Sequence, residues 1–150
     1  MTTSEAMALS MASSGSYGTF TEFDVPGGSA TQIFGINNVG DFAGDFLSDA
    51  GIFQAFVSIG GTITPIDIPD VTFSGAYQLN ATNQVVGYYT DSAGINHGFS
   101  RDGDGTLTFP IDPPGSTGTI LFGNNDQNWA VGRYTDSSGA DSWALLHPAG

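Results

Sequence analysis

The side chains best suited to chemistry in this sequence are its carboxylates and its two histidines. Aspartate and glutamate number 15, lysine and arginine together number 2, and cysteine is absent. Without cysteine the chain has no thiolate nucleophile, disulfide or zinc–thiolate site. His97 and His147 lie outside any recognisable nucleophile, metalloprotease or phosphate-binding motif, and the spacing of the acids alone leaves a glycosidase-type carboxylate pair open. We therefore expect a protein that is not an enzyme.

The segment that most resembles a metal-binding loop is Arg101–Gly105, in which Asp102 and Asp104 alternate with other residues. Asp-x-Asp-Gly is the first half of a calcium-binding loop, where carboxylate oxygens are the ligands. The remaining ligands of such a loop, including its distal glutamate, do not follow here. A tight hairpin turn is therefore the favoured interpretation, calcium binding is the alternative, and no other cofactor is expected.

Two tryptophans, Trp129 and Trp143, are candidate ligand-binding residues. An aromatic face combined with amide and carboxylate hydrogen bonds is typical of a sugar site. Both tryptophans lie in the last third of the chain, and the positions equivalent to them in the first third are Asp41 and Ala55. This uneven distribution weakens the case for one sugar site per repeat.

Three copies of one unit position these side chains. In each copy an alternating strand ends in Asp-x-Pro, and a glycine follows within a later apolar strand. Both markers recur at spacings of 43 and 45 residues; they are Asp24, Asp67 and Asp112, and Gly44, Gly87 and Gly132. Such a constant register indicates duplication. The sequence therefore predicts an N-terminal extension over 1–17 and one domain over 18–150, with repeats at about 18–61, 62–105 and 106–150.

Each unit contains four short strands separated by turn residues. In the second copy these strands are expected at Thr62–Ile68, Ala76–Leu79, Gln84–Tyr89 and His97–Arg101. We interpret the three aspartates as strand-end caps. Glycine is normally avoided inside a strand, so the three glycines indicate a bulge or a close approach of two backbones. No apolar helical period appears inside the repeats, and the predicted class is all-β.

These motifs resemble those of the HAF-repeat family, whose members are described as probable extracellular repeat proteins. The resembling segments are GINNVGDFAGDF, VVGYYTDSAGINHGFSRDGDGTLTFPID and VGRYTDSSGADSW. The triplet for which the family is named stands here as Gln54-Ala55-Phe56, His97-Gly98-Phe99 and Ser142-Trp143-Ala144. Only the second copy keeps the histidine, which favours a packing role over chemistry. The resemblance implies an exported, β-rich protein and brings no established active site.

A four-stranded unit of about 40–45 residues has the size of a propeller blade, and propellers typically have about 4–8 blades. Three blades cannot close a ring. A propeller-like chain of this length would therefore cover its open ends with another copy or with its own extra segment. Association with further copies would give a ring or a filament. The alternative is a closed β-trefoil or β-prism, which needs no partner.

The N-terminal extension is a candidate docking strand. Its apolar residues Met7, Leu9 and Met11 alternate with small or polar ones, which is typical of a strand, although a short helix is an open alternative. Such a strand would complete the sheet of a neighbouring copy by strand addition.

The charge balance narrows the choice of partners. The net charge is −13 and the chain has no lysine, which excludes nucleic acid and anionic membranes as partners. No apolar run approaches the roughly 20 residues that span a bilayer. The resemblance implies an extracellular or cell-surface location. The open ends of the repeats, the N-terminal extension and the lack of a catalytic motif lead us to expect a structural or adhesive protein that assembles with itself through its sheet edges. The alternative is a lectin-like module that binds glycans.

Overall fold

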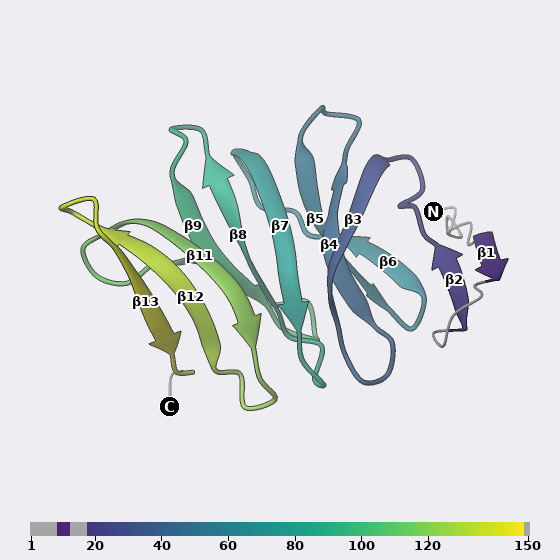
Figure 1. Ribbon diagram of the computed structural model, residues 1–150. Coiled ribbons are helices and arrows are strands. Elements are labelled where there is room, and N and C mark those ends of the chain that lie inside the picture. The colour runs from purple at the N-terminus through teal and green to yellow at the C-terminus, as the bar shows by residue number, and fades with distance from the viewer. Residues whose placement is uncertain (1–8, 13–17, 149–150) are drawn as a thin grey trace.

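Every regular element of the computed structural model is a β-strand (Figure 1). The structure describes residues 18–148 and, for residues 9–12, the backbone alone. The prediction of an all-β chain is confirmed for these residues.

The strands form three main antiparallel sheets, in each of which a strand pairs with the one before it. Sheet 1 consists of β3 (Ser29–Ile36), β4 (Phe42–Leu47), β5 (Phe53–Ile59) and β6 (Thr62–Pro65). Sheet 2 consists of β7 (Val71–Leu79), β8 (Val85–Asp91), β9 (Asn96–Arg101) and β10 (Leu107–Ile111). Sheet 3 consists of β11 (Ser116–Asn124), β12 (Ala130–Asp136) and β13 (Asp141–Leu146). The expected four strands are thus present in sheets 1 and 2, whereas sheet 3 has three among the described residues.

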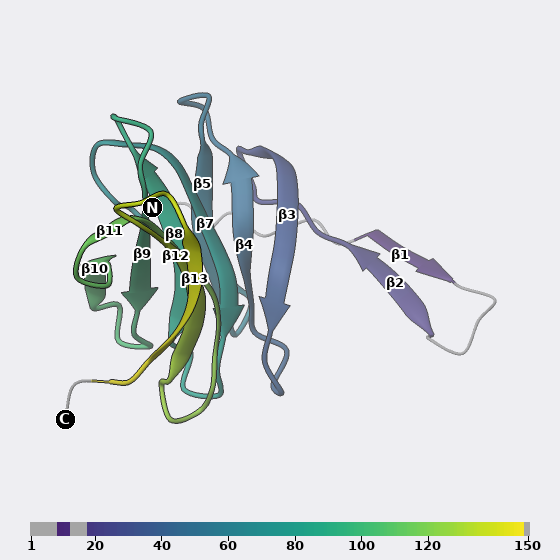
Figure 2. The same cartoon turned by 60° about the vertical axis from the view of Figure 1, so that its left-hand side comes forward.

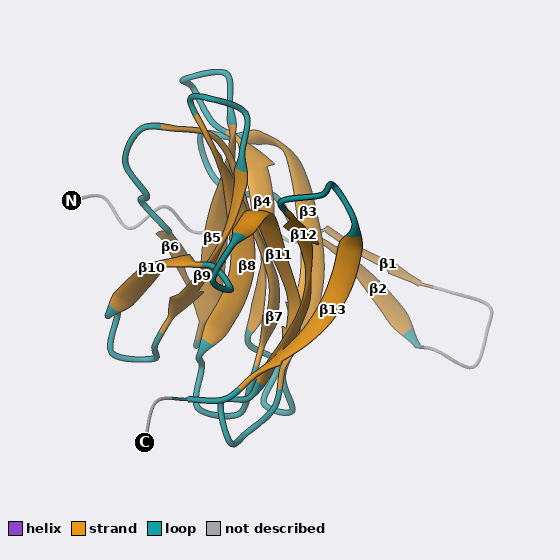
Figure 3. Ribbon diagram, turned by 90° about the vertical axis from the view of Figure 1, so that its left-hand side faces the viewer, coloured by secondary structure: helices purple, strands orange, loops and turns teal. Residues whose placement is uncertain are grey.

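The three sheets are stacked in chain order. Strands β3, β4 and β5 pack against β7, and strands β7, β8 and β9 pack against β11. Figure 3 looks along the stack and places β6 and β10 together on one side of it. The sheets remain open, and no barrel closes within residues 9–12 and 18–148. A closed β-trefoil is therefore wrong, because its strands would have to close into a barrel. A β-prism does not fit either, because sheet 2 lies between sheets 1 and 3 in a linear stack.

The sheets are offset by one strand from the units marked out in the sequence. The expected strand Thr62–Ile68 opens the second unit, yet β6 pairs with β5 and belongs to sheet 1. The reason is local. Gly60 and Gly61 both have positive φ, 56° and 82°, which allows the tight turn that folds β6 back on β5.

The three mid-strand glycines lie where two strands come unusually close. A Cβ atom at Gly44, Gly87 or Gly132 would overlap a carbonyl oxygen of the first strand of the same sheet. Opposite each glycine the register of that first strand shifts, between Ile33 and Gly35, between Ala76 and Gln78, and between Leu121 and Gly123. The predicted close approach and the predicted bulge therefore occur together at all three positions.

Most of the apolar core lies between sheets 1 and 2. Its buried residues are Ala43, Ala55, Val57, Ile66, Ile68, Ala76, Leu79, Val85, Tyr89 and Phe99. A second cluster on the outer side of sheet 1 contains Val25, Phe46 and Phe56. The cluster between sheets 2 and 3 contains Val86, Leu121 and Ala130. The core between sheets 2 and 3 thus has fewer and smaller side chains than that between sheets 1 and 2.

Substitution of Gly87 by alanine tests the close approach. The added methyl group would meet the carbonyl oxygen of Gly75, which is backbone and cannot turn aside. We expect a loss of about 1–3 kcal/mol in the free energy of unfolding, measured by urea denaturation. Gly123→Ala is the matched control, because Gly123 also lies within a strand and its Cβ would meet only Val131 Cγ2 at 3.6 Å. Equal stability of the two variants would contradict this account.

Candidate assembly interface

A row of three asparagines holds the turns that follow the first strand of each sheet. Asn37, Asn80 and Asn125 occur at the same 43- and 45-residue spacing as the sequence markers. The Oδ1 atom of each accepts two backbone N–H groups of its own turn, at 2.9 to 3.1 Å. The sequence predicts such side-chain-stabilised turns, because asparagine favours them.

The other end of the same amide connects one sheet to the next. Asn37 Nδ2 donates to the carbonyl oxygen of Asn80 at 3.3 Å and to Asn83 Oδ1 at 2.8 Å. Asn80 Nδ2 donates in the same way to Asn125 at 2.8 Å and to Asn128 Oδ1 at 2.7 Å. Asn80 is buried, whereas Asn125 is exposed and its Nδ2 has no hydrogen-bond partner among the described residues. The row therefore ends at sheet 3 on an unused donor.

A row of aromatic rings runs beside the asparagines. Phe34, Tyr77 and Phe122 are the extra residues of the three bulges, so they too repeat from sheet to sheet. The rings of Phe34 and Tyr77 are stacked, with centroids 4.8 Å apart, and Tyr77 meets Phe122 edge to face at 6.0 Å. Phe122 in turn lies 5.9 Å from Trp143. The aromatic row thus reaches the outer surface of sheet 3.

The outer surface of sheet 3, which we call the C-terminal face, carries exposed apolar side chains. They are Phe122, Trp129, Val131, Trp143 and Leu145. Val131 lies directly opposite Leu145 on the neighbouring strand, and Trp143 is two residues away on the same face of β13. Trp143 is 74% exposed. Adjacent exposed apolar side chains of this kind are typical of an interaction surface, whereas single scattered ones occur on most protein surfaces.

The C-terminal face differs from the faces that pack inside the stack. The positions equivalent to Trp143 in sheets 1 and 2 are Ala55 and Gly98. Ala55 is fully buried, and a Cβ on Gly98 would lie 2.7 Å from the carbonyl oxygen of Ile111. Sheets 1 and 2 therefore require a small residue where sheet 3 has its most exposed tryptophan.

An open depression of about 340 Å³ lies at the edge of this face. It is lined by Gln78, Gly123, Asn124, Asn125, Trp129, Val131 and Leu145. Of the two tryptophans predicted as ligand-binding residues, Trp129 lines the depression and also contacts His147, with ring centroids 4.0 Å apart and the ring planes tilted by 45°. Trp143 lies on the same face but does not line the depression. The structure thus brings the two tryptophans to one face without placing them in one site.

The opposite end of the molecule carries a two-stranded hairpin of β1 (Leu9–Ala12) and β2 (Thr19–Glu22). Leu9 and Met11 of the expected docking strand lie in β1, opposite Glu22 and Phe20, and Met7 lies outside the described residues. All four residues of β2 are exposed. Figure 2 shows the hairpin projecting away from the stack of sheets.

The three aspartates expected to cap strands do not share one environment. Asp67 accepts a hydrogen bond from Gln54, and Asp112 contacts His97 Nδ1 at 2.7 Å. In both cases the aspartate follows the fourth strand of a sheet and its partner lies on the third. The side chain of Asp24 has no hydrogen bond among the described residues. The sequence did not reveal these cross-strand pairs, whose members are separated by 13 residues in sheet 1 and by 15 in sheet 2.

His97 is held between two carboxylates, Asp112 and Asp91, the latter at 3.2 Å from Nε2. Partial burial of the imidazole lowers the pKa of His97, but the hydrogen bonds to the two aspartates outweigh this effect and the pKa is raised above its usual value. Because Gln54 makes the equivalent contact in sheet 1, the arrangement fits the packing role expected for this histidine.

Asp45 is the most deeply buried carboxyl group among the described residues, with 1% of its surface exposed. Burial raises the pKa of Asp45 to about 6. Its Oδ1 atom has no hydrogen-bond partner within the described residues. The group lies in β4, against Gly75 of the second sheet, and the sequence offered no sign that it differs from the other acids.

The candidate calcium loop forms the turn between β9 and β10. The carboxylate of Asp104 accepts the backbone N–H of Thr106 at 2.8 Å, which lowers the pKa of Asp104. Asp102 accepts a hydrogen bond from Gln84 Nε2 at 2.9 Å. Within residues 18–148 no group of three histidine, aspartate or glutamate side chains is arranged to hold a metal ion. The two aspartates therefore have hydrogen-bonding roles in and beside a hairpin turn.

Comparisons with known proteins found no matching family model, no matching curated protein and no matching solved structure. In the part of the chain that the structure describes, no helix has the length and apolar character needed to cross a membrane.

Substitution of Asn80 by alanine tests the connection between sheets. Asn80 makes hydrogen bonds in its own turn and two to the next turn, whereas Asn125 makes only those of its own turn. We expect Asn80→Ala to cost about 1–3 kcal/mol more in the free energy of unfolding than Asn125→Ala, because it also removes the two hydrogen bonds that join sheet 2 to sheet 3. Urea denaturation of both variants measures the difference. Equal losses would show that the bonds between sheets contribute nothing.

Proposed function

We propose that this protein is a non-enzymatic, extracellular structural or adhesive module, whose propeller-like sheets associate with further copies of the chain to form a ring or a filament. The extracellular location is supported by the family resemblance of its motifs. The self-association is supported by the geometry of the two ends of the stack.

The observation that carries this proposal is the C-terminal face together with the edge beside it. Val131, Trp143 and Leu145 are between 47% and 74% exposed and adjacent on two strands. Strand β13 also ends sheet 3, so one of its edges pairs with β12 and no described residue pairs with the other. Exposed apolar surface favours burial, and a free edge offers unpaired N–H and C=O groups to another strand.

The charge of the chain acts against association and makes it dependent on salt. With a net charge of −13, two copies repel each other. The repulsion is screened beyond about 10 Å at 0.1 M salt. Association through apolar contacts and backbone hydrogen bonds should therefore strengthen as ionic strength rises.

A head-to-tail contact between copies has two outcomes. If the rotation between copies closes, two chains of three sheets give a six-sheet ring, and if it does not close, the contact repeats as a filament. Both outcomes fit the stacked order of the sheets. Both also require the C-terminal face of one copy to meet the N-terminal end of another.

Light scattering after size-exclusion chromatography tests the self-association. We expect a mass above the 15.5 kDa of the single chain at micromolar concentration, increasing with ionic strength. Leu145→Lys should give a monomer, because it places a charge in the C-terminal face. Ile95→Lys is the matched control, since Ile95 is an exposed aliphatic residue in the β8–β9 turn of the middle sheet. A wild-type monomer at all ionic strengths would refute self-assembly.

A lectin-like module is the second candidate function, and the depression beside Trp129 favours it. An indole ring stands there beside the amide groups of Gln78, Asn124 and Asn125. This combination of an aromatic face and hydrogen-bonding amides suits the two sides of a sugar ring.

A glycan array, probed with and without calcium, tests sugar binding. If the depression binds a sugar, Trp129→Ala should lower the affinity about ten-fold or more, because the stacking surface is lost. Trp143→Ala should keep the affinity, since this residue lies on the same face outside the depression. An array on which the wild-type protein binds no glycan in either condition would remove this function.

A further inference from the structure

Sheet 3 differs from the other two sheets in lacking a fourth strand among the described residues. In sheet 1 the fourth strand, β6, pairs with β5, and in sheet 2 the fourth strand, β10, pairs with β9. The equivalent third strand of sheet 3 is β13, whose second edge pairs with no described residue. The edge thus has the form of a site for one more strand.

Strand β2 has the sequence of a fourth strand but belongs to none of the three main sheets. It precedes Asp24-Val25-Pro26, just as β6 precedes Asp67-Ile68-Pro69 and β10 precedes Asp112-Pro113-Pro114. The residues after it are already placed as in the other copies. Val25 packs with Phe46 and Phe56 of the following sheet, and its counterpart Ile68 belongs to the core cluster that contains Tyr89 and Phe99. Only β2 itself lacks the sheet that its position implies.

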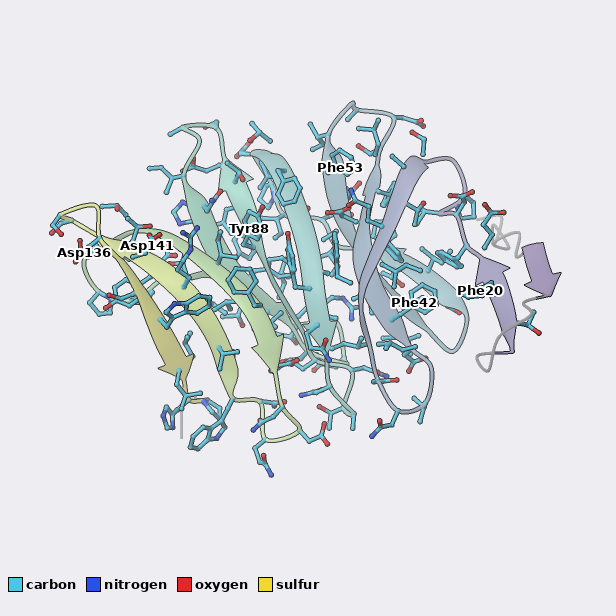
Figure 4. The ribbon with its side chains drawn as sticks, viewed as in Figure 1. Phe20, Phe42, Phe53, Tyr88, Asp136 and Asp141 are labelled. Atoms are coloured by element: carbon cyan, nitrogen blue, oxygen red, sulfur yellow. The ribbon has the colours of Figure 1, made fainter. Side chains whose placement is uncertain are left out.

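The β13 edge of the same molecule is out of reach of β2. Phe20, on β2, lies at one end of the stack, and Asp136 and Asp141, at the β12–β13 turn, lie at the other end (Figures 1 and 4). Phe20 is 59% exposed, so it contributes little to the packing of its own chain. A fourth strand for sheet 3 that comes from β2 must therefore come from a second copy.

A cavity beside β13 matches a side chain that β2 carries. About 480 Å³ lies between sheets 2 and 3, lined in part by Val86, Leu121, Ala130 and Leu146. The space exists because sheet 3 has small residues on this side. Ala130 of sheet 3 stands at the position of Phe42 in sheet 1 and Val85 in sheet 2. Ala144 of sheet 3 stands at the position of Phe56 in sheet 1 and Phe99 in sheet 2.

The fourth strand of sheet 1 shows which residue would fill that space. Ile63 of β6 packs on the corresponding side of sheet 1, against the cluster of Val25, Phe46 and Phe56. Its counterpart on β2 is the larger Phe20. A large aromatic side chain thus stands at the position that faces the cavity.

We propose that β2 of one copy docks as the fourth strand of sheet 3 of another copy, antiparallel to β13, with Phe20 in the cavity between sheets 2 and 3. This inference rests on the proposed self-association and names the contact that produces it. The register follows sheet 1, where Phe56 lies opposite Pro65 and Ser58 opposite Ile63. In the docked pair Glu22 lies opposite Ala144, and Phe20 lies opposite Leu146.

The docked strand also supplies the one cross-strand pair that sheet 3 lacks. In sheets 1 and 2 the aspartate after the fourth strand bonds to a side chain of the third, as Asp67 does with Gln54 and Asp112 with His97. The counterparts are Asp24 of the donor and Ser142 of the acceptor. Neither has a side-chain hydrogen bond among the described residues, and a serine hydroxyl can donate to a carboxylate.

Docking would also cover the C-terminal face. The segments between β6 and β7 and between β10 and β11 carry the chain from the fourth strand of one sheet to the first strand of the next, and residues 23–28 between β2 and β3 do the same. The donor's sheet 1 would therefore lie over Val131 and Leu145 of the acceptor.

Disulfide formation between two single-cysteine variants tests the docked register. The wild-type chain has no cysteine, so every disulfide must join the introduced residues. Glu22→Cys and Ala144→Cys are mixed, oxidised and separated on a non-reducing gel. Residues opposite each other in a non-hydrogen-bonded antiparallel pair are about 4.5 Å apart at Cα, which suits a disulfide. We expect a heterodimer between the two variants.

Ser142→Cys, mixed with Glu22→Cys, is the matched control for register, because Ser142 lies on the same face of β13 two residues away. Its yield of heterodimer should be about ten-fold lower. Phe20→Ala should weaken wild-type association by about ten-fold or more, while leaving the thermal stability of the monomer unchanged. An assembled protein with equal yields for both cysteine pairs would overturn strand donation and leave self-association standing. A wild-type protein that stays monomeric would overturn both proposals.

Discussion

The amide group of Asn80 is the interaction on which the arrangement of the sheets depends. Its Oδ1 accepts hydrogen bonds within its own turn, and its Nδ2 donates two to the turn of the next sheet. An amide side chain has two donors and two acceptor lone pairs, so nearly its whole capacity is used in a position that is 4% exposed. Because an unpaired amide in this environment would be costly, the two turns are held at one separation.

The glycines and the bulges recur in each sheet together with these asparagines. With the turns held together, the first strand of each sheet lies close to the first strand of the next, and the bulge directs Phe34, Tyr77 and Phe122 into a common row. On the partner strand, Gly87 and its counterparts leave room for the carbonyl oxygen of the bulged strand. One repeated amide, one repeated glycine and one repeated aromatic residue therefore serve a single geometry.

The strands, the turns and the close approach at the glycines could be predicted from the sequence, because each depends on residues near one another in the chain. The sheet boundaries could not. A repeat can be divided at any point, and only the turn at Gly60 and Gly61 shows that the strand after it closes the preceding sheet. The donor bonds of Asn37 and Asn80, and the burial of Asp45, depend on which sheet lies next to which, and a single sequence does not state this. The sequence placed the docking strand at Met7, Leu9 and Met11, whereas the contact that we propose uses β2.

The junction that we propose between two copies would differ from the junctions between sheets inside one chain. Asn83 and Asn128 each supply an Oδ1 acceptor to the preceding asparagine, but the equivalent position in the first sheet is Gly40, which has the same left-handed backbone and no side chain. If Asn125 Nδ2 reached the first sheet of another copy, its equivalent acceptor would be the carbonyl oxygen of Asn37, and no side-chain acceptor would stand at Gly40. Trp143 would alter the same junction further, because the equivalent residues inside the stack are the much smaller Ala55 and Gly98. In the proposed assembly, contacts between chains would thus be weaker in their polar part than contacts within a chain, and they would derive their strength from apolar burial and strand pairing.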